Sequence, residues 1–493
     1  MMGAMTLHDD AAYLALKTHD ARFDGRLFVG VTSTGIYCRP VCRVRTPLRR
    51  NCRFFANAAS AESEGFRPCL RCRPELAPGL SLVDSSQVLA GHAARLIEQA
   101  ARGGEDAYLP DIAAQLGVTD RHLRRIFRQA HGVTPIDYLA TQRLLLAKQL
   151  LTDTDMPVTQ VALCSGHASL RRFNAAFVQR YRLNPTALRR QAAALPRSAA
   201  ASPREAAWLR LAYRPPYDTA GMLAFLAARA LPGVEQVDGL ELRRTLGWTH
   251  QGQVLQGWLQ CRFVPQRHEL RLGVAPALLP AAGALMQRLR HALDLDADPS
   301  VIDACLAGMP QPPRPGLRLP GSMDGFEAAT RIILGQQVSV AAARTLARRL
   351  VAEFGRPVAT PFAGLDRLFP AAADLAAADP ERIGRLGIVR QRVAALQALA
   401  RQVAEGRIAL HPGAPLASTL QALRALPGIG EWTQQLIAMR VLAWPDAFPA
   451  SDVGVLNALG TRDTSAALAR AEAWRPWRAY AVMGLWQSLE GKT

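Results

Sequence analysis

The stretch Leu426-Pro427-Gly428-Ile429-Gly430-Glu431-Trp432-Thr433 decides the fold of the last third of this chain. Its two glycines predict a tight hairpin, and the apolar spacing that follows predicts a helix over 431–440. The backbone N–H groups of Gly428 and Gly430 can meet a phosphate, because the N-terminus of the predicted helix lies behind them. On its own, this motif is a moderately specific signal for DNA binding without sequence preference.

A carboxylate follows the hairpin after a loop that contains proline. Asp452, in the stretch Phe448-Pro449-Ala450-Ser451-Asp452-Val453, lies 22 residues beyond Gly430. Helical spacing of apolar residues, interrupted by glycine and proline, continues on both sides of the hairpin. We therefore expect an all-helical domain over 291–493, with helices at 326–334, 340–354, 383–405, 416–425, 431–440 and 477–489.

A hairpin followed by proline and aspartate at this distance resembles the helix-hairpin-helix base-excision glycosylases. Further matches over 208–490 are similar to the AlkA type of 3-methyladenine glycosylase. The matching stretches are Arg214-Pro215-Pro216-Tyr217-Asp218, Phe225-Leu226-Ala227-Ala228-Arg229, Arg314-Pro315-Gly316-Leu317-Arg318-Leu319-Pro320-Gly321, Ile333-Leu334-Gly335-Gln336-Gln337-Val338-Ser339 and Trp474-Arg475-Pro476-Trp477-Arg478-Ala479-Tyr480-Ala481.

This resemblance implies a role for each matching residue. Asp452 would stabilise the positive charge that develops on the sugar as a damaged base departs, and would orient or activate the water. Trp432, Trp486 and Phe225 would line an aromatic pocket that stacks on cationic alkylated purines, although core packing is the alternative for any single aromatic residue. Family members that also cut the strand have a lysine where this chain has Trp432, so the implied enzyme is monofunctional.

Two residues depart from the pattern of the family's best-known member. Leu436 stands where that member has a pocket tyrosine, and Gln337 stands where it has a leucine that wedges into the base stack. Base flipping needs a side chain to fill the gap, and Gln337 would do so less hydrophobically than leucine. We therefore expect the range of excised bases to differ.

Five of the eight cysteines lie within 35 residues near the N-terminus. Cys38 and Cys42 form a C-x3-C pair, and Cys69 and Cys72 form a C-x2-C pair, which together make a tetrahedral thiolate set suited to one zinc ion. The fifth, Cys52, is expected to be a buried structural thiol rather than a ligand. From the spacing alone, a zinc knuckle that only staples a small domain is the alternative.

The residues around these cysteines resemble the N-terminal domain of the Ada alkylation-response proteins, over roughly residues 8–78. The matching stretches are Thr34-Gly35-Ile36-Tyr37-Cys38-Arg39-Pro40-Val41-Cys42-Arg43-Val44-Arg45, Phe54-Phe55-Ala56-Asn57-Ala58 and Gly65-Phe66-Arg67-Pro68-Cys69-Leu70-Arg71-Cys72. The resemblance implies that Cys38 is both a zinc ligand and the acceptor of a methyl group from a methylphosphotriester in DNA. Zinc keeps a thiolate nucleophilic at neutral pH.

The same chemistry predicts a switch for DNA binding. Four thiolates around a divalent ion carry a net charge of about −2, and methylation of one sulfur halves that charge and its repulsion of phosphate. The arginines around the centre are suited to gripping phosphates, although a solvated basic face is the alternative for each one. They are Arg39, Arg43, Arg45, Arg67, Arg71 and Arg73.

Two helix-turn-helix patterns lie between residues 85 and 191. The first has a short helix at 109–116, a glycine turn, Thr119 as N-cap and a second helix at 120–129; the second copy runs over 157–177. The segment resembles the AraC-type regulator domain, which implies two recognition helices in successive major-groove segments. A helical bundle without DNA is the alternative. The expected base or phosphate contacts are Arg121, His122, Arg125, Arg171, Arg172 and Asn174.

Composition and charge agree with a DNA-binding, modular protein. The chain has 493 residues, 59 Lys and Arg against 40 Asp and Glu, and 49% hydrophobic residues, which excludes wholesale disorder and favours a polyanionic partner. It has no apolar run long enough to span a membrane, and acids rather than a basic patch near its start, so we expect no membrane association. The expected location is cytoplasmic and nucleoid-associated, in a bacterium.

We therefore predict a multidomain α+β protein in five segments. These are a zinc methyl-acceptor domain (1–80), an all-helical double helix-turn-helix domain (85–191), a linker (192–207), a mixed α/β domain (208–290) and the all-helical glycosylase domain (291–493). The expected partners are double-stranded DNA, alkylated and promoter, and RNA polymerase. A Pro-Cys-His-Arg tetrapeptide, which marks the second methyltransferase of Ada proteins, is absent from the sequence, so reversal of O6-methylguanine is not expected.

The prediction for function combines methylphosphotriester methyl acceptance, methylation-switched transcriptional activation and excision of alkylated bases such as 3-methyladenine and 7-methylguanine. One alternative is a transcription regulator whose glycosylase-like half only binds DNA and is catalytically weak. Another is a repair enzyme that uses the helix-turn-helix segment only for non-specific docking. Asp452 together with the aromatic pocket argues against the first of these.

Overall fold

The structure is a computed structural model that describes residues 9–19, 27–55, 58–72, 74, 82–103, 108–194, 207–250 and 252–490. The chain divides into two compact units, one of residues 1–100 and 106–142 and the other of residues 101–105 and 143–493. Arg73 and most of the predicted linker at 192–207 lie outside the described residues. Within the described ranges, no helix has the length and apolarity required to cross a membrane.

The N-terminal domain is built on a four-stranded sheet with the order β3-β1-β2-β4. β1 pairs antiparallel with β2 and β3, whereas β2 pairs in parallel with β4. Small apolar clusters lie on the sheet, including one in which Phe28, Tyr37 and Phe66 pack together. The elements are α1 (Asp9–Lys17), β1 (Phe28–Val31), β2 (Ile36–Cys38), η2 (Arg49–Asn51), β3 (Cys52–Phe55), α2 (Ala58–Ser63) and β4 (Arg67–Pro68).

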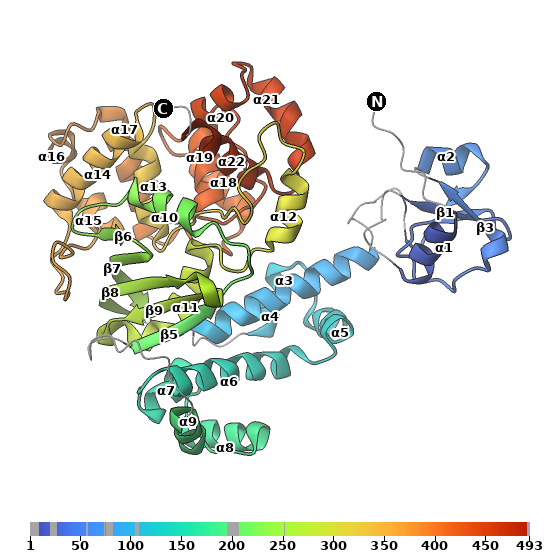
Figure 1. Ribbon diagram of the computed structural model, residues 1–493, viewed down its shortest axis with the longest axis horizontal. Coiled ribbons are helices and arrows are strands. Elements are labelled where there is room, and N and C mark those ends of the chain that lie inside the picture. Colours follow the sequence, from blue (N-terminus) through green and yellow to red (C-terminus); the bar gives the residue numbers. More distant parts are fainter. Residues whose placement is uncertain are drawn as a thin grey trace. The chain divides into compact units, whose positions relative to one another are not determined.

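The next segment is entirely helical where it is described, as predicted (Figure 1). Side-chain caps fix the start of the second helix in each helix-turn-helix copy: Thr119 accepts from the backbone N–H of His122, and Ser169 from that of Arg172. The helices are α3 (Leu82–Gly103), α4 (Leu109–Gln115), α5 (Asp120–His131), α6 (Pro135–Asp153), α7 (Val158–Cys164), α8 (Leu170–Tyr181) and α9 (Pro185–Ala194).

A five-stranded antiparallel sheet with the order β5-β9-β8-β7-β6 follows. It confirms the mixed α and β character predicted from the alternating runs at 240–243 and 270–272. The elements are β5 (Ala207–Ala212), α10 (Thr219–Ala227), β6 (Glu235–Asp238), β7 (Glu241–His250), β8 (Gln253–Val264), η4 (Pro265–Arg267), β9 (Glu269–Val274), η5 (Pro276–Ala281) and α11 (Ala282–Ala292).

This sheet shares one apolar core with the second helix-turn-helix copy. Leu150 of α6 and Phe173 and Phe177 of α8 belong to the same buried cluster as Leu209 and Leu272 of the sheet. At the border, the guanidinium of Arg210 lies 3.1 Å from the carboxylate of Asp153. Gly283 of α11 lies against the backbone of Arg102. A Cβ at this position would lie 2.2 Å from the carbonyl oxygen of Arg102, so only glycine allows so close an approach.

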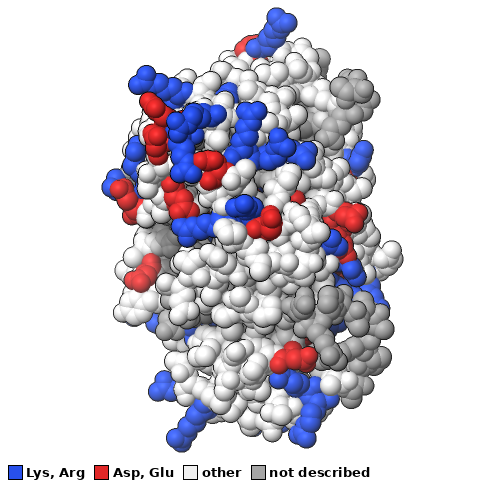
Figure 2. Space-filling model, turned by 90° about the vertical axis from the view of Figure 1, so that its left-hand side faces the viewer, with Lys and Arg blue, Asp and Glu red and all other residues white. Residues whose placement is uncertain are grey.

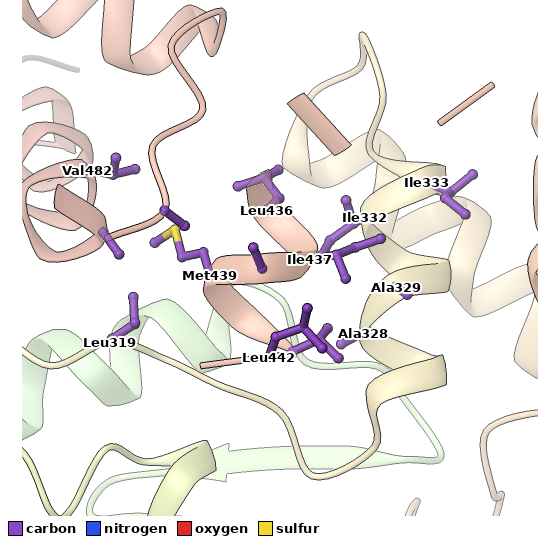
Figure 3. Close-up of a cluster of buried hydrophobic side chains, with 14 of the residues drawn as sticks. Leu319, Ala328, Ala329, Ile332, Ile333, Leu436, Ile437, Met439, Leu442 and Val482 are labelled. Carbon is purple, nitrogen blue, oxygen red and sulfur yellow. The ribbon is translucent and has the colours of Figure 1, made fainter. Parts of the chain in front are cut away.

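The last third of the chain is the predicted helical domain. Its longer helices pack around α13 and α19, whose apolar residues face each other in the core (Figure 3). The helices are α12 (Pro299–Leu306), α13 (Gly325–Leu334), α14 (Val340–Phe354), α15 (Ala372–Ala377), α16 (Pro380–Gly384), α17 (Arg390–Ala404), α18 (Leu416–Arg424), α19 (Glu431–Arg440), α20 (Val453–Ala458), α21 (Thr464–Ala471), η6 (Glu472–Trp474) and α22 (Arg478–Glu490).

The prediction of a single helix over 383–405 is wrong. The structure has the end of α16 and the start of α17 there, separated by a turn. Gly387 has a φ of +88°, a left-handed conformation that ends a helix and that glycine adopts without strain. The apolar periodicity continued through this turn, because residues on both sides pack into the same core.

A buried carboxylate joins the sheet to the helical domain. Asp294 accepts hydrogen bonds from the backbone N–H of Leu319 at 3.0 Å and from the hydroxyl of Tyr480 at 2.8 Å. Burial raises the pKa of Asp294 to about 7, from 3.8. Between these two values the folded state binds a proton that the unfolded chain has already released, so this group lowers the free energy of unfolding as pH rises from about 4 to about 7.

We therefore expect Asp294→Asn to raise the free energy of unfolding, relative to wild type, by more at pH 8 than at pH 4. Asparagine keeps the shape, tolerates the φ of +51° at this position, and removes the buried charge. The stability difference between variant and wild type should change by up to about 4 kcal/mol between the two pH values. Urea unfolding at both pH values measures it. Asp298→Asn is the control, since Asp298 is exposed and its pKa is lowered. If the free energy of unfolding changed with pH equally in wild type and in Asp294→Asn, the prediction would be contradicted.

Candidate active site and metal centre

Four cysteine sulfurs converge where two parallel strands end. Cys38 is the last residue of β2 and Cys69 follows β4, and Tyr37 lies opposite Pro68 in the parallel pairing of these strands. The turn after each strand brings in Cys42 and Cys72, so the four Sγ atoms lie within 4.8 Å of one another. All four cysteines are buried, and the distance and donor set fit a tetrahedral zinc site.

The thiols of this cluster affect one another's ionisation. Hydrogen bonding to Cys42 and to Cys72, together with burial, raises the pKa of Cys38, whereas hydrogen bonds from Cys38 and Cys72 lower the pKa of Cys42. The ionisation of one sulfur thus makes ionisation of its neighbours less favourable. A divalent ion would remove this competition, because it would bind all four sulfurs as thiolates. The backbone N–H of Arg39 also donates to Cys72 Sγ at 3.4 Å.

Exposure separates the four sulfurs into two pairs. Cys42 and Cys72 are 1% and 0% exposed, whereas Cys38 and Cys69 are 5% and 7% exposed. A nucleophile has to reach its electrophile, so the slightly greater exposure of Cys38 and Cys69 makes these two the better candidates. Cys52 is buried in a separate apolar cluster with Leu27 and Val29 and lies outside the sulfur cluster, as predicted.

The arginines around the centre do not all face solvent. Arg43, Arg45, Arg67 and Arg71 are exposed and can reach a phosphate. Arg39 cannot serve as predicted: its side chain is 0% exposed, and its guanidinium donates to the carbonyl oxygen of Cys72 at 3.3 Å. Because this cation supports the turn that carries Cys72, its role in the structure is to hold the metal cluster.

Removal of the metal, by chelation or by Cys69→Ala, is expected to unfold the N-terminal domain. Only small apolar clusters besides the cysteines hold its described residues together, and so small a domain depends on its metal. Base release should continue, because the glycosylase core lies in the other compact unit. Limited proteolysis and a base-release assay on one sample measure both effects, with Cys52→Ala as the control. Loss of base release together with the N-terminal fold would contradict the independence of the two.

The two helix-turn-helix copies present their predicted contact residues outward. On α5, Arg121 and Arg125 are exposed and His122 is half-buried, while Phe127 packs inside. On α8, the exposed residues are Arg171, Arg172 and Asn174, while Phe173 and Phe177 are fully buried. Each recognition helix therefore carries a polar or basic face that is open to solvent.

Asp452 is held by three N–H donors. It is the N-cap of α20, and its Oδ1 accepts from the backbone N–H of Val455 at 3.0 Å. The indole Nε1 of Trp486 donates to Oδ1 at 2.9 Å, and that of Trp432 donates to Oδ2 at 2.9 Å. Both oxygens are thus fixed in direction, by helices α19, α20 and α22.

These residues line one cavity of about 350 Å³, a volume within the range of small-molecule sites. Phe225 from α10, Trp432 and Leu436 from α19 and Trp486 from α22 form its apolar wall, and Asp452 lies in the same wall. The structure thus brings together the three predicted pocket aromatics and the predicted acid, from segments that are up to 261 residues apart in the chain.

The hairpin and the loop after α13 are joined at the mouth of this cavity. Gly428 has a φ of +73°, and Gly430 is the N-cap of α19. Gln336 Nε2 donates to Gly428 O at 2.8 Å and to Thr433 Oγ1 at 3.0 Å. These two hydrogen bonds hold Gln336 in place. The next residue, Gln337, is exposed and has a left-handed φ of +53°, and Val338, which follows it, lines the cavity. Gln337 therefore occupies the position from which a side chain could enter a base stack.

Sequence reasoning missed Gln336 and four arginines that line the cavity, Arg229, Arg331, Arg344 and Arg440. One signal for Arg229 was present: it lies four residues after Phe225, the spacing that places two side chains on one face of a helix. Arg331 and Arg440 come from α13 and α19, and nothing local in the sequence marks them as neighbours.

Basic residues also gather on the surface. In the view of Figure 2, Lys and Arg side chains are concentrated in the upper part of the face, with a few acidic groups between them. On α14, which begins at the cavity mouth, Arg344, Arg348 and Arg349 are exposed. A clustered basic surface of this kind is the electrostatic footprint of a DNA-binding protein.

Four family models match the chain, in the order predicted. They are "Metal binding domain of Ada" over 11–75, "Helix-turn-helix domain" over 112–191, "AlkA N-terminal domain" over 208–324 and "HhH-GPD superfamily base excision DNA repair protein" over 330–478. The matches confirm the resemblances drawn from the motifs.

Curated relatives fall into one full-length match and partial ones. "Probable bifunctional transcriptional activator/DNA repair enzyme AlkA" of Mycobacterium tuberculosis is 39% identical over 98% of this chain and 97% of its own length. "DNA-3-methyladenine glycosylase 2" of Escherichia coli is 34% identical over 56% of this chain and 95% of its own length. "Bifunctional transcriptional activator/DNA repair enzyme Ada" of Escherichia coli is 34% identical over 33% of this chain and 44% of its own length. Because the first of these matches end to end, the chain belongs to the family of bifunctional transcriptional activator/DNA repair enzymes of the AlkA type.

Proposed function

We propose that this protein is a monofunctional DNA glycosylase for alkylated bases, joined to a methyl-accepting transcriptional activator. The observation that carries the first part is the carboxylate of Asp452, fixed by the indole N–H groups of Trp432 and Trp486 in the wall of an apolar cavity. The similarity to a relative named DNA-3-methyladenine glycosylase 2 supports 3-methyladenine as a substrate. Because 7-methylguanine is likewise a cationic alkylated purine, we include it in the proposal.

Asp452 acts on the sugar rather than on the base. As the C1′–N bond breaks, its electron pair passes to the base, and positive charge develops at C1′ and the ring oxygen. A carboxylate with both oxygens already oriented stabilises this charge without reorganisation, and it aligns the water that then bonds to C1′. The cavity surrounds the base with the three aromatic residues and Leu436, and aromatic rings stack on an alkylated purine that is already cationic.

The enzyme stops after base release. A strand-cutting glycosylase needs an amine that forms a Schiff base with the sugar, and Trp432 stands at the position where such enzymes have lysine. The ring nitrogen of Trp432 is engaged with Asp452 and cannot act as a nucleophile. The product is therefore an intact strand with an abasic site.

The N-terminal domain accepts a methyl group at Cys38. The Sγ lone pair attacks the methyl carbon of a methylphosphotriester, the methyl–oxygen bond breaks, and its electrons remain on the phosphate oxygen as an ordinary phosphodiester. Cys38, Cys42, Cys69 and Cys72 would hold one zinc ion, which would keep the Cys38 sulfur as a thiolate at neutral pH. Of the four cysteines, Cys38 and Cys69 are the two more exposed residues, and the Ada resemblance favours Cys38 as the acceptor. Arg43, Arg45, Arg67 and Arg71 bring the phosphate close.

Methylation then switches transcription. The methylated centre loses one negative charge and repels DNA less, while α5 and α8 contact promoter DNA through Arg121, His122, Arg125, Arg171, Arg172 and Asn174. As an activator on the bacterial nucleoid, the protein also contacts RNA polymerase. We place the functional segments at 1–80, 85–191, 208–290 and 291–493, with a linker at 192–207.

One experiment tests both activities. The full-length protein is incubated with duplex DNA that carries alkylated bases and methylphosphotriesters, and released bases and the mass of the Cys38 peptide are measured together. We expect 3-methyladenine and 7-methylguanine in solution and one added methyl per chain. Methyl uptake without base release would mean that the C-terminal half only binds DNA. Promoter binding is measured separately, by footprinting. If the protein released bases but did not protect promoter DNA, the helix-turn-helix segment would serve only for non-specific docking on DNA.

A further inference from the structure

The wall of the Asp452 cavity carries more positive than negative groups. Among the described residues that line it, four are arginines and one, Asp452, is acidic. Because like charges repel, a wall with an excess of positive groups does not attract a base through the base's own positive charge. A guanidinium is suited instead to hydrogen-bond acceptors, since all its polar groups are N–H donors. The question is which of the four arginines lies where a base would be held.

Arg331 and Arg440 make contacts with groups outside the cavity wall, and Arg344 lies at the rim. Arg331 lies 2.9 Å from the carboxylate of Glu235 and 2.8 Å from that of Glu327, so its charge is balanced behind the wall. Arg440 is half-buried, donates its Nε to the carbonyl oxygen of Pro320 at 3.3 Å, and has its guanidinium carbon 5.0 Å from the ring centroid of Phe225. Burial and repulsion by Arg229 and Arg331 lower the pKa of Arg440 to about 9. Arg344 is exposed on α14 at the rim.

Arg229 lies closer to the ring of Phe225 than Arg440 does. Its guanidinium carbon lies 3.6 Å from the ring centroid of Phe225, and its Nη1 donates to the carbonyl oxygen of Phe225 at 3.2 Å. Its backbone carbonyl in turn accepts from Arg331 Nη2. These contacts hold a planar cation against the ring that would cover one side of a bound base.

We propose that the Arg229 guanidinium donates a hydrogen bond to a carbonyl or ring-nitrogen acceptor of the departing base, and that this contact determines how well the site releases neutral bases. The proposal rests on the glycosylase function proposed above. A cationic base takes up the electrons of the broken C1′–N bond and leaves neutral, so it needs little help. A neutral base leaves as an anion, and a cation at its acceptor edge stabilises that anion as it forms; the base then takes a proton from water.

The test compares two lesions in otherwise identical duplexes, 7-methylguanine as the cationic base and hypoxanthine as a neutral base that carries a carbonyl group. Single-turnover rates are measured with full-length wild type, Arg229→Met, Arg229→Lys and Arg344→Met. Arg229→Met should lower the hypoxanthine rate about 10- to 100-fold and the 7-methylguanine rate by no more than about threefold. Arg229→Lys, which keeps a cation, should recover part of the hypoxanthine rate.

Arg344→Met is the matched control, because it removes an arginine at the rim and should change both rates alike through DNA affinity. The ratio of the two rates within one preparation is independent of the fraction of folded enzyme, so a poorly folding variant still gives an answer. Equal losses on both lesions in Arg229→Met, or no recovery of the ratio by lysine, would overturn the proposal. Release of neither base by wild type would instead overturn the glycosylase function on which it rests.

Discussion

Asp452→Asn is expected to slow the release of 7-methylguanine by two to four orders of magnitude, the range typical of a lost electrostatic or acid–base contribution. Asparagine retains the shape of aspartate and the ability to cap α20, so Val455 N–H keeps its acceptor and the fold should survive. The negative charge next to the sugar is lost, and so is one of the two acceptors for the indoles of Trp432 and Trp486. Single-turnover base release, with DNA affinity measured separately, tests this.

The control is Asp463→Asn, which makes the same change at the N-cap of another helix, α21. That variant should keep full activity, because Asp463 is remote from the cavity wall. The affinity of Asp452→Asn for damaged DNA should change little, since the contribution is made in the transition state. Near-normal rates in Asp452→Asn would remove this residue from the mechanism.

Methyl uptake is expected to fall to background in Cys38→Ala. The nucleophilic sulfur is gone, and Cys42 and Cys72 are too deeply buried to replace it. Cys69 is the informative alternative, because it is 7% exposed. Mass spectrometry of tryptic peptides after incubation with methylphosphotriester DNA locates the methyl group. A methyl on Cys69 in the wild type would exclude Cys38 as the acceptor.

Cys52→Ala is the control for this change, since it removes a buried cysteine from the same small domain without touching the sulfur cluster. It should accept methyl normally, and base release should be unchanged in both variants. In the wild type, methylation should raise promoter affinity about tenfold at low salt, and the gain should shrink as salt screens the charges. Equal affinity of both forms at low salt would exclude the electrostatic switch.

Local signals predicted most of the secondary structure and the residue types of the site. Thr119 and Ser169 stand directly before helices that they cap, and the two glycines of the hairpin form a turn that the chain can make without neighbours. The division of 383–405 into two helices was missed, since apolar spacing is the same for a helix and for a helix–turn–helix that packs on one core.

The sequence by itself determined the chemistry available to this protein: the C-x3-C and C-x2-C pairs, the hairpin followed by Asp452, and the pocket aromatics, because these depend on residue type and short spacing. The tertiary structure alone decided how those groups are used. It buried Arg39 against Cys72, placed two indole N–H groups on Asp452, and set Arg229 against Phe225 in the same cavity as Arg440. The contacts of Asp452 with Trp432 and Trp486 join residues that are 20 and 34 positions apart in the chain. The packing of α10, α13, α19 and α22 around a common core brings such residues into one cavity.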